Sequence, residues 1–153
     1  MFHVVLVEPE IPQNTGNVAR TCAATGAMLH LVHPLGFSVS DRYLKRAGLD
    51  YWHLVEVHHH QSFGDLRKQY PDGAFFFATA RHGRRYTEVD YPAGSFLVFG
   101  KETAGLPDEL LEANADTCVR LPKLSAARSL NLSNAVAVLL YEALRQHKFP
   151  GLE

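Results

Sequence analysis

The chain has 153 residues, of which 46% are hydrophobic, so it can bury one good core, and nothing in it indicates a second domain. No apolar run is long enough to span a bilayer, and the first seven residues lack the basic lead and cleavage site of a signal peptide, which predicts a cytoplasmic protein without a membrane partner. With a formal net charge of -1, any nucleic acid must be held by a local basic patch.

Cys22 and Cys118 lie inside predicted secondary structure without the spacing of metal ligands. We therefore expect both to be reduced structural thiols, and we expect no metal centre.

The first predicted elements are a strand and a helix. Residues 2–7 are apolar and β-branched, and the prolines that follow at 9 and 12 require a turn. Residues 14–26 begin with a capping type of residue and end on glycine, which predicts a helix capped by Asn14. Asn14, Asn17 and Arg20 are three residues apart and share one helix face. A solvated face accounts for the amides, whereas Arg20 is placed to grip a phosphate or an alkoxide.

The next stretch predicts two strands, at residues 28–33 and 54–57, with a short helix at 41–48 between them. Arg42 and Arg46 are expected on the surface of that helix. The triplet His58 to His60 suggests a metal site, but adjacent strand residues point to opposite faces. We therefore interpret the triplet as ordinary strand residues.

Residues 74–79 form a continuous apolar run, which is typical of a strand buried on both faces of a parallel sheet. A helix at 63–70 precedes it. The basic cluster from Arg81 to Arg85 follows, in a predicted loop that is either simply solvated or a patch for phosphate groups. Residues 86–94 are interpreted as loop or a fragment of helix.

An apolar run at residues 96–99 changes directly into a polar turn bounded by Gly100 and Gly105, and a helix is predicted from Pro107 to residue 113. A strand, a glycine-bounded loop and a helix start form the usual ligand site of an open α/β sheet, although an ordinary turn fits the residues equally well. A strand at 117–121, a loop at 122–128 and a long buried helix at 131–145 complete the chain.

Alternating strands and helices predict one α/β domain, residues 1–153, with a mainly parallel sheet. Neither a G-x-G-x-x-G turn after the first strand nor a G-x-x-x-x-G-K-[ST] motif is present. A dinucleotide dehydrogenase and a P-loop NTPase are therefore disfavoured.

Three stretches together, residues 14–21, 99–107 and 128–138, resemble the motifs of the SPOUT superfamily of RNA methyltransferases. The compact length, the opening Val-Glu-Pro-Glu-Ile-Pro-Gln-Asn-Thr-Gly-Asn and the Arg-Ala-Gly-Leu-Asp-Tyr at 46–51 extend the similarity over the whole chain. Within the superfamily, it is most similar to the group that methylates the 2'-hydroxyl of the wobble cytidine or uridine of tRNA.

The resemblance implies a SPOUT fold, an α/β domain whose C-terminal segment forms a trefoil knot, and a homodimer that binds S-adenosyl-L-methionine and the anticodon stem-loop of tRNA. By position, the residues implied for the cofactor pocket are Ala78, Thr79, Gly100, Glu102, Leu121, Ser129 and Asn131. The RNA contacts that we expect are Asn17, Arg20, Arg42, Arg46, Arg81 and Tyr141.

The resemblance also implies that Arg20 is the catalytic residue that activates the ribose hydroxyl. A guanidinium has a pKa of about 12.5 or more and stays charged. Our hypothesis is therefore that Arg20 stabilises the developing alkoxide and grips the adjacent phosphate. Two alternatives stay open: a methyltransferase that acts on another RNA, and a non-catalytic RNA-binding SPOUT protein.

Overall fold

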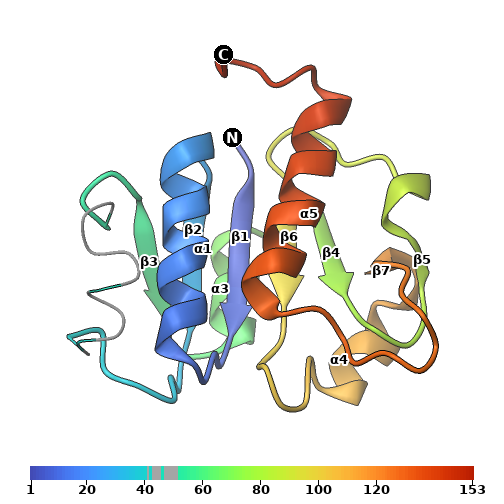
Figure 1. Cartoon of the computed structure of the whole chain (residues 1–153), viewed down its shortest axis with the longest axis horizontal. Helices are drawn as coiled ribbons and strands as arrows, with labels where there is room; N and C mark the ends of the chain where they lie inside the picture. Colours follow the sequence, from blue (N-terminus) through green and yellow to red (C-terminus); the bar gives the residue numbers. More distant parts are fainter. Residues whose placement is uncertain (41, 43–45, 47–51) are drawn as a thin grey trace.

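The computed structural model describes residues 1–40, 42, 46 and 52–153, which form one seven-stranded sheet with helices on both faces (Figure 1). The strand order is β3-β2-β1-β6-β4-β7-β5, and each neighbouring pair among the described residues is parallel. The strands are β1 (His3–Val7), β2 (Met28–Val32), β3 (Val57–His60), β4 (Phe75–Ala78), β5 (Arg84–Arg85), β6 (Phe96–Phe99) and β7 (Cys118–Arg120).

Helices of the described part of the chain cover both faces of the sheet. Helices α1 (Pro12–Thr25) and α5 (Leu132–Gln146) lie side by side on one face, where Val18 and Leu139 are fully buried (Figure 1). Helices α3 (Phe63–Gln69) and α4 (Asp108–Ala113) bury Leu66 and Leu111 against the other face. Two short 3-10 helices, η1 (Tyr86–Glu88) and η2 (Ala115–Thr117), lie between strands. None of the described helices has the length and apolar character needed to cross a membrane.

The central strands are buried on both faces, which is typical of a parallel sheet covered by helices on both sides. All four residues of β6 are buried, and Phe75, Phe76 and Phe77 of β4 are buried beside them. Fully burying an aliphatic or aromatic side chain contributes about 1.5–3 kcal/mol, so these strands need an apolar layer on each face. The prediction of a mainly parallel α/β sheet is confirmed.

The third strand starts later than predicted. It runs from Val57 to His60 rather than over 54–57, because the residues that pair with β2 are Val57 to His60, while Leu54 is exposed. Nδ1 of His59 lies 2.8 Å from Nε2 of His33. The predicted helix at 41–48 lies outside the described residues except for Arg42 and Arg46, which are both exposed.

The prediction of a loop for the whole basic cluster is wrong in part. Arg84 and Arg85 form β5, which pairs with β7 at the edge of the sheet. Gly83 makes this approach possible: it has a φ of 96°, and a Cβ there would lie 2.6 Å from the Cys118 carbonyl oxygen. Arg120 Nε donates a 3.1 Å hydrogen bond to the Gly83 carbonyl oxygen. The backbone conformation of Gly83 and the hydrogen bond from Arg120 therefore allow a short edge strand here, and the pattern of charges reveals neither of them.

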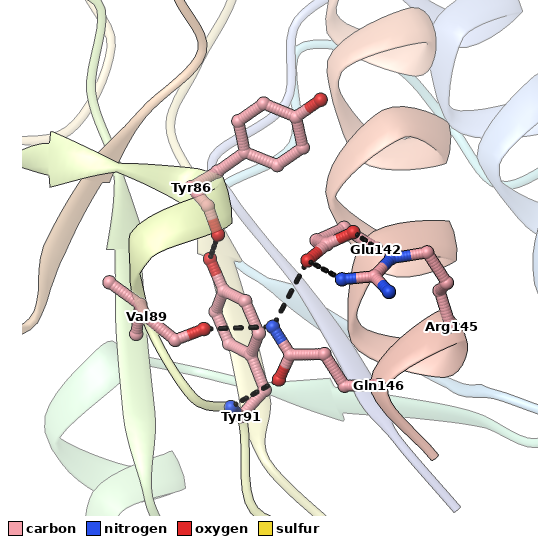
Figure 2. A network of polar contacts seen from close by, with 6 residues as sticks. All are labelled: Tyr86, Val89, Tyr91, Glu142, Arg145 and Gln146. Carbon is pink, nitrogen blue, oxygen red and sulfur yellow. Dashed lines mark hydrogen bonds and ion pairs between the residues drawn. The ribbon is translucent and has the colours of Figure 1, made fainter. Parts of the chain in front are cut away.

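Helix α5 is anchored to the segment that follows η1 by a polar network (Figure 2). The Gln146 side chain accepts from the Tyr91 backbone N–H at 2.9 Å and donates to the Val89 carbonyl oxygen at 2.8 Å. Glu142 is buried, and Arg145 donates to its carboxylate through two nitrogens, at 2.7 and 2.9 Å. The network fixes the carboxyl half of α5 and so orients its first turn, which borders the site described below.

Three histidines form a hydrogen-bonded chain across neighbouring strands. Nδ1 of His3 lies 2.9 Å from Nε2 of His30, and Nδ1 of His30 lies 2.9 Å from Nε2 of His60. Burial is the largest cause that lowers the pKa of His3 to about 4 and that of His30 to about 3. The three imidazoles are therefore neutral at physiological pH. The ring of His58, which stacks on His30, also lowers the pKa of His30.

This histidine chain predicts acid lability. A histidine whose pKa is lowered by folding contributes fully above its unfolded value of 6.5, and the contribution is lost as pH falls from there toward the folded value, about 3 for His30. We expect the free energy of unfolding to decrease below pH 6.5, by up to about 1.4 kcal/mol per pH unit for one such group.

Urea unfolding at a series of pH values from about 7.5 to about 5 measures this effect. His30→Leu should flatten the dependence, whereas His53→Gln, which removes an exposed histidine, should leave it unchanged. A wild-type stability that stays constant over this range would contradict the prediction.

Candidate functional site

A cavity of about 620 Å³ lies at the carboxyl ends of β4, β6 and β7. Residues of the first turns of α1 and α5 and of the segment between β6 and α4 also line it. In Figure 1 these parts of the chain lie at the end of the sheet to which the arrows of β4 and β6 point. The carboxyl edge of an open parallel sheet is the usual ligand site of such folds, and the volume is in the range that small-molecule ligands occupy.

The cavity brings together all seven residues that the resemblance implies for a cofactor pocket, although they come from four separate segments. They are Ala78, Thr79, Gly100, Glu102, Leu121, Ser129 and Asn131. Of the residues expected to contact RNA, Arg81 also lines it. Asn17 and Arg20 are exposed on α1, and Tyr141 is exposed on α5; these three are not among the described lining residues.

The loop after β6 folds back on itself so that its backbone forms one wall of the cavity. Lys101 and Gly105 make an isolated antiparallel bridge, and the Gly105 N–H donates a 2.9 Å hydrogen bond to the Lys101 carbonyl oxygen. A Cβ at Gly100 would lie 2.1 Å from the Gly105 carbonyl carbon, so only glycine fits. Helix α4 begins at Asp108 with Pro107 in the N-cap position, one residue later than predicted.

Three polar side chains connect the three motif stretches. The Glu102 carboxylate accepts from Asn14 Nδ2 at 3.3 Å, and Asn14 Oδ1 accepts from Asn131 Nδ2 at 3.0 Å. Asn131 in turn caps α5 by accepting from the Ser133 backbone N–H at 2.9 Å. A hydrogen-bonded chain of this kind holds its members in fixed orientations at the mouth of the cavity.

The interpretation of Asn14 as a helix cap is wrong. Helix α1 begins at Pro12, with Ile11 in the N-cap position and no side-chain cap, because proline is preorganised for the first helical turn. Asn14 therefore lies inside the first turn, where it is 5% exposed and faces the cavity. The sequence held one signal that Asn14 belongs to the site, namely its position in the first motif stretch. The prediction gave more weight to the preference of asparagine for helix caps.

Basic side chains surround the cavity, which also carries Glu102 and Asp108. Arg81, Lys101, Lys123 and Arg128 all line it, and Lys123 Nζ donates a 2.8 Å hydrogen bond to the Ala127 carbonyl oxygen. Just outside, Arg84 and Arg85 are exposed on β5. Within the described residues, no group of three histidine, cysteine, aspartate or glutamate side chains is placed to hold a metal ion. The arrangement favours an organic ligand with a phosphate-bearing partner at the mouth.

Comparison with known proteins gives consistent matches over nearly the whole chain. Residues 1–141 match the SpoU rRNA Methylase family. A tRNA (cytidine(34)-2'-O)-methyltransferase from Acidovorax sp. is 53% identical, over 97% of this chain and 94% of that protein. A solved structure described as giving structural insights into the 2-OH methylation of C/U34 on tRNA is 46% identical, with a TM-score of 0.92 and 97% of each chain covered.

An rRNA methyltransferase from Sinorhizobium meliloti, solved with AdoMet bound, is 28% identical with a TM-score of 0.83. The match covers 94% of this chain and 56% of that one. The same fold therefore also occurs as one part of a larger methyltransferase.

Proposed function

The chain belongs to the SpoU rRNA Methylase family, and from this we propose that it transfers a methyl group from S-adenosyl-L-methionine to the ribose 2'-hydroxyl of nucleotide 34, a cytidine or uridine, in the anticodon loop of tRNA. One observation carries the proposal. The cavity joins the three motif stretches through Glu102, Asn14 and Asn131, in a chain that is 53% identical to a protein named for this reaction.

We propose that residues lining the cavity hold the adenine, the ribose and the methionine tail of the cofactor. Backbone groups of Gly100 and Leu121 are proposed to hold the adenine and ribose, since the glycine admits close approach. Ala78, the last residue of β4, and Thr79, which follows it, also line the cavity. Ser129, close in sequence to Asn131, is proposed to bind a polar group of the same ligand.

When bound, S-adenosyl-L-methionine would supply an electrophilic methyl group on its sulfonium, and the neutral thioether S-adenosyl-L-homocysteine would be the leaving group. The ribose 2'-oxygen would take up the methyl group as the carbon–sulfur bond breaks, and the hydroxyl proton would pass to water or to a phosphate oxygen. The protein must orient the hydroxyl and stabilise its developing negative charge. We assign this role to Arg20, whose planar guanidinium can donate two hydrogen bonds in fixed geometry.

We further propose that the enzyme is a cytoplasmic homodimer. The outer face of α5 exposes apolar side chains, with Val138 at 38%, Tyr141 at 43% and Phe149, just beyond the helix, at 39%. A second copy would cover these groups. Because Arg20 is not among the residues lining the cavity of its own chain, mixed dimers test which copy supplies it. Combining Arg20→Ala with Gly100→Ala subunits should restore activity only if the two residues act from different chains.

RNA binding is proposed to use Arg81, Arg84 and Arg85 beside the cavity, with Arg42 and Arg46 as further phosphate contacts. The triple variant of the first three to alanine should weaken tRNA binding. It should also lower the slope of log affinity against log salt by about 1 for each phosphate that the protein no longer neutralises. Filter binding at several salt concentrations measures both quantities.

The matched control for this variant is Lys68→Ala, which removes an exposed positive charge from α3, a helix that contacts β3 at the edge of the sheet opposite to β5. It should leave the salt dependence unchanged. A triple variant with wild-type affinity at every salt concentration would exclude this patch.

The function itself is tested with labelled S-adenosyl-L-methionine and tRNA purified from cells lacking the gene. Label should appear as a 2'-O-methyl group on nucleotide 34 of the tRNA. Label at another RNA position would support the first alternative, a methyltransferase with a different target. Cofactor binding with no transfer to any cellular RNA would support the non-catalytic alternative.

A further inference from the structure

Two glutamate carboxylates accept hydrogen bonds across the edge of the cavity, in opposite directions. The Glu102 carboxylate, on the loop after β6, accepts from the backbone N–H groups of Glu10 at 2.9 Å and of Ile11. In the opposite direction, Glu10 Oε1 accepts from the Thr103 backbone N–H at 3.0 Å and from Thr103 Oγ1 at 2.7 Å. The loop and the segment before α1 therefore hold each other through both carboxylates. We call this reciprocal contact the Glu10 latch.

The backbone of Glu10 also packs closely against Gly36. The Gly36 N–H donates a 2.9 Å hydrogen bond to the Pro9 carbonyl oxygen, and a Cβ at Gly36 would lie 2.8 Å from the Glu10 Cα. The Glu10 backbone is thus fixed between Gly36 on one side and Glu102 on the other, and its side chain reaches the tip of the loop at Thr103. The hydrogen bonds from Thr103 also lower the pKa of Glu10 below its usual value.

The latch connects two parts of the site that otherwise belong to separate elements. The loop of residues 100–106 is a wall of the cavity, and the segment at 10–14 leads into α1, which carries Arg20. Glu10 is not among the described residues that line the cavity, so it acts on the loop rather than on the ligand. A contact that fixes a binding loop without touching the ligand improves binding by lowering the cost of ordering that loop.

We propose that Glu10 is a positioning residue, which holds the loop of residues 100–106 in its cofactor-binding conformation through Thr103. The proposal rests on the proposed function, because the ligand held by this loop is taken to be S-adenosyl-L-methionine. It assigns a role to a residue outside the three motif stretches, since Glu10 precedes Asn14, where the first stretch begins.

The test uses the full chain and isothermal titration with S-adenosyl-L-methionine. Glu10→Ala should weaken binding by about ten-fold, since two hydrogen bonds to a charged acceptor are lost. Glu10→Gln, which keeps an acceptor oxygen, should lose less. Thr103→Val, which removes only the hydroxyl donor, should weaken binding less than Glu10→Ala does. It should cause no further loss in the Glu10→Ala protein, because that protein already lacks the acceptor of the hydroxyl. Glu112→Gln, at an exposed position on α4, is the matched control.

Kinetics and stability separate positioning from a purely structural role. Glu10→Ala should raise KM for S-adenosyl-L-methionine while kcat at saturating cofactor and the ligand-free melting temperature stay close to wild type. The role proposed for Glu10 would be overturned if Glu10→Ala bound the cofactor with wild-type affinity. It would also be overturned if the losses of affinity in Glu10→Ala and Thr103→Val added in the double variant. Neither result would affect the proposed function. If the wild-type protein failed to bind S-adenosyl-L-methionine, the proposed function would be overturned, and the role proposed for Glu10 would be overturned with it.

Discussion

Arg20→Ala is expected to lower kcat for methyl transfer by about 10²–10³-fold, which is the usual cost of removing one preorganised donor to a developing negative charge. The affinity for S-adenosyl-L-methionine should stay near wild type, because Arg20 is exposed on α1 and does not line the described cavity. Single-turnover transfer at saturating cofactor and tRNA, together with calorimetric binding of the cofactor alone, measures the two quantities separately.

Arg20→Lys distinguishes charge from geometry. Lysine keeps the positive charge but loses the planar pair of donors, so its rate should lie well below that of wild type. Arg67→Lys, on α3 at the opposite face of the sheet, is the control and should transfer methyl groups normally. Near-normal turnover in Arg20→Lys would rule out the bidentate grip, and near-normal turnover in Arg20→Ala would remove Arg20 from the mechanism.

Gly100→Ala should abolish cofactor binding, because the new methyl group would lie 2.1 Å from the Gly105 carbonyl carbon and 2.2 Å from the Leu106 nitrogen. Neither neighbour is a flexible side chain, so the loop must open. Strain of this kind typically costs about 1–3 kcal/mol or more, and the cavity loses one of its walls. Thermal unfolding with and without S-adenosyl-L-methionine measures both effects, and the ligand should no longer raise the melting temperature.

Gly64→Ala is the matched substitution. Gly64 lies in α3, and a Cβ there would meet only the Ser62 hydroxyl oxygen, at 3.7 Å, among the described residues. Alanine also has the higher helix propensity, so this variant should be as stable as wild type or slightly more stable. If Gly100→Ala bound cofactor with wild-type affinity, the closed shape of the loop would not be required for binding.

Much of the fold could be predicted because the strands carry strong signals. The apolar run at residues 74–79 indicated a strand buried on both faces, and the run at 96–99 indicated a buried strand. These became the central strands β4 and β6. Gly26, predicted to end the first helix, does so with a φ of 73°. Periodicity could not place β3 or β5, because their residues are mostly histidines and arginines, and long-range pairing with β2 and β7 decides their positions.

The candidate site was harder to predict from local sequence patterns than the fold was. The glycine-bounded turn after residue 99 indicated a ligand loop, but only the resemblance connected it to residues 14–21 and 128–138. The structure shows why: Asn14 contacts Glu102 and Asn131 across 88 and 117 residues of chain, and no pattern of neighbouring residues contains such a contact. The trefoil knot and the homodimer stay predictions, as do the roles assigned to individual site residues.

The most direct test of the central claim compares two tRNA substrates that differ only at nucleotide 34, with ribose in one and 2'-deoxyribose in the other. The purified protein and labelled S-adenosyl-L-methionine are incubated with each, and incorporated label is counted. A 2'-O-methyltransferase specific for this position must label the ribose substrate and leave the deoxyribose substrate unlabelled. Equal labelling of both would show that the methyl group goes elsewhere and would contradict the assignment.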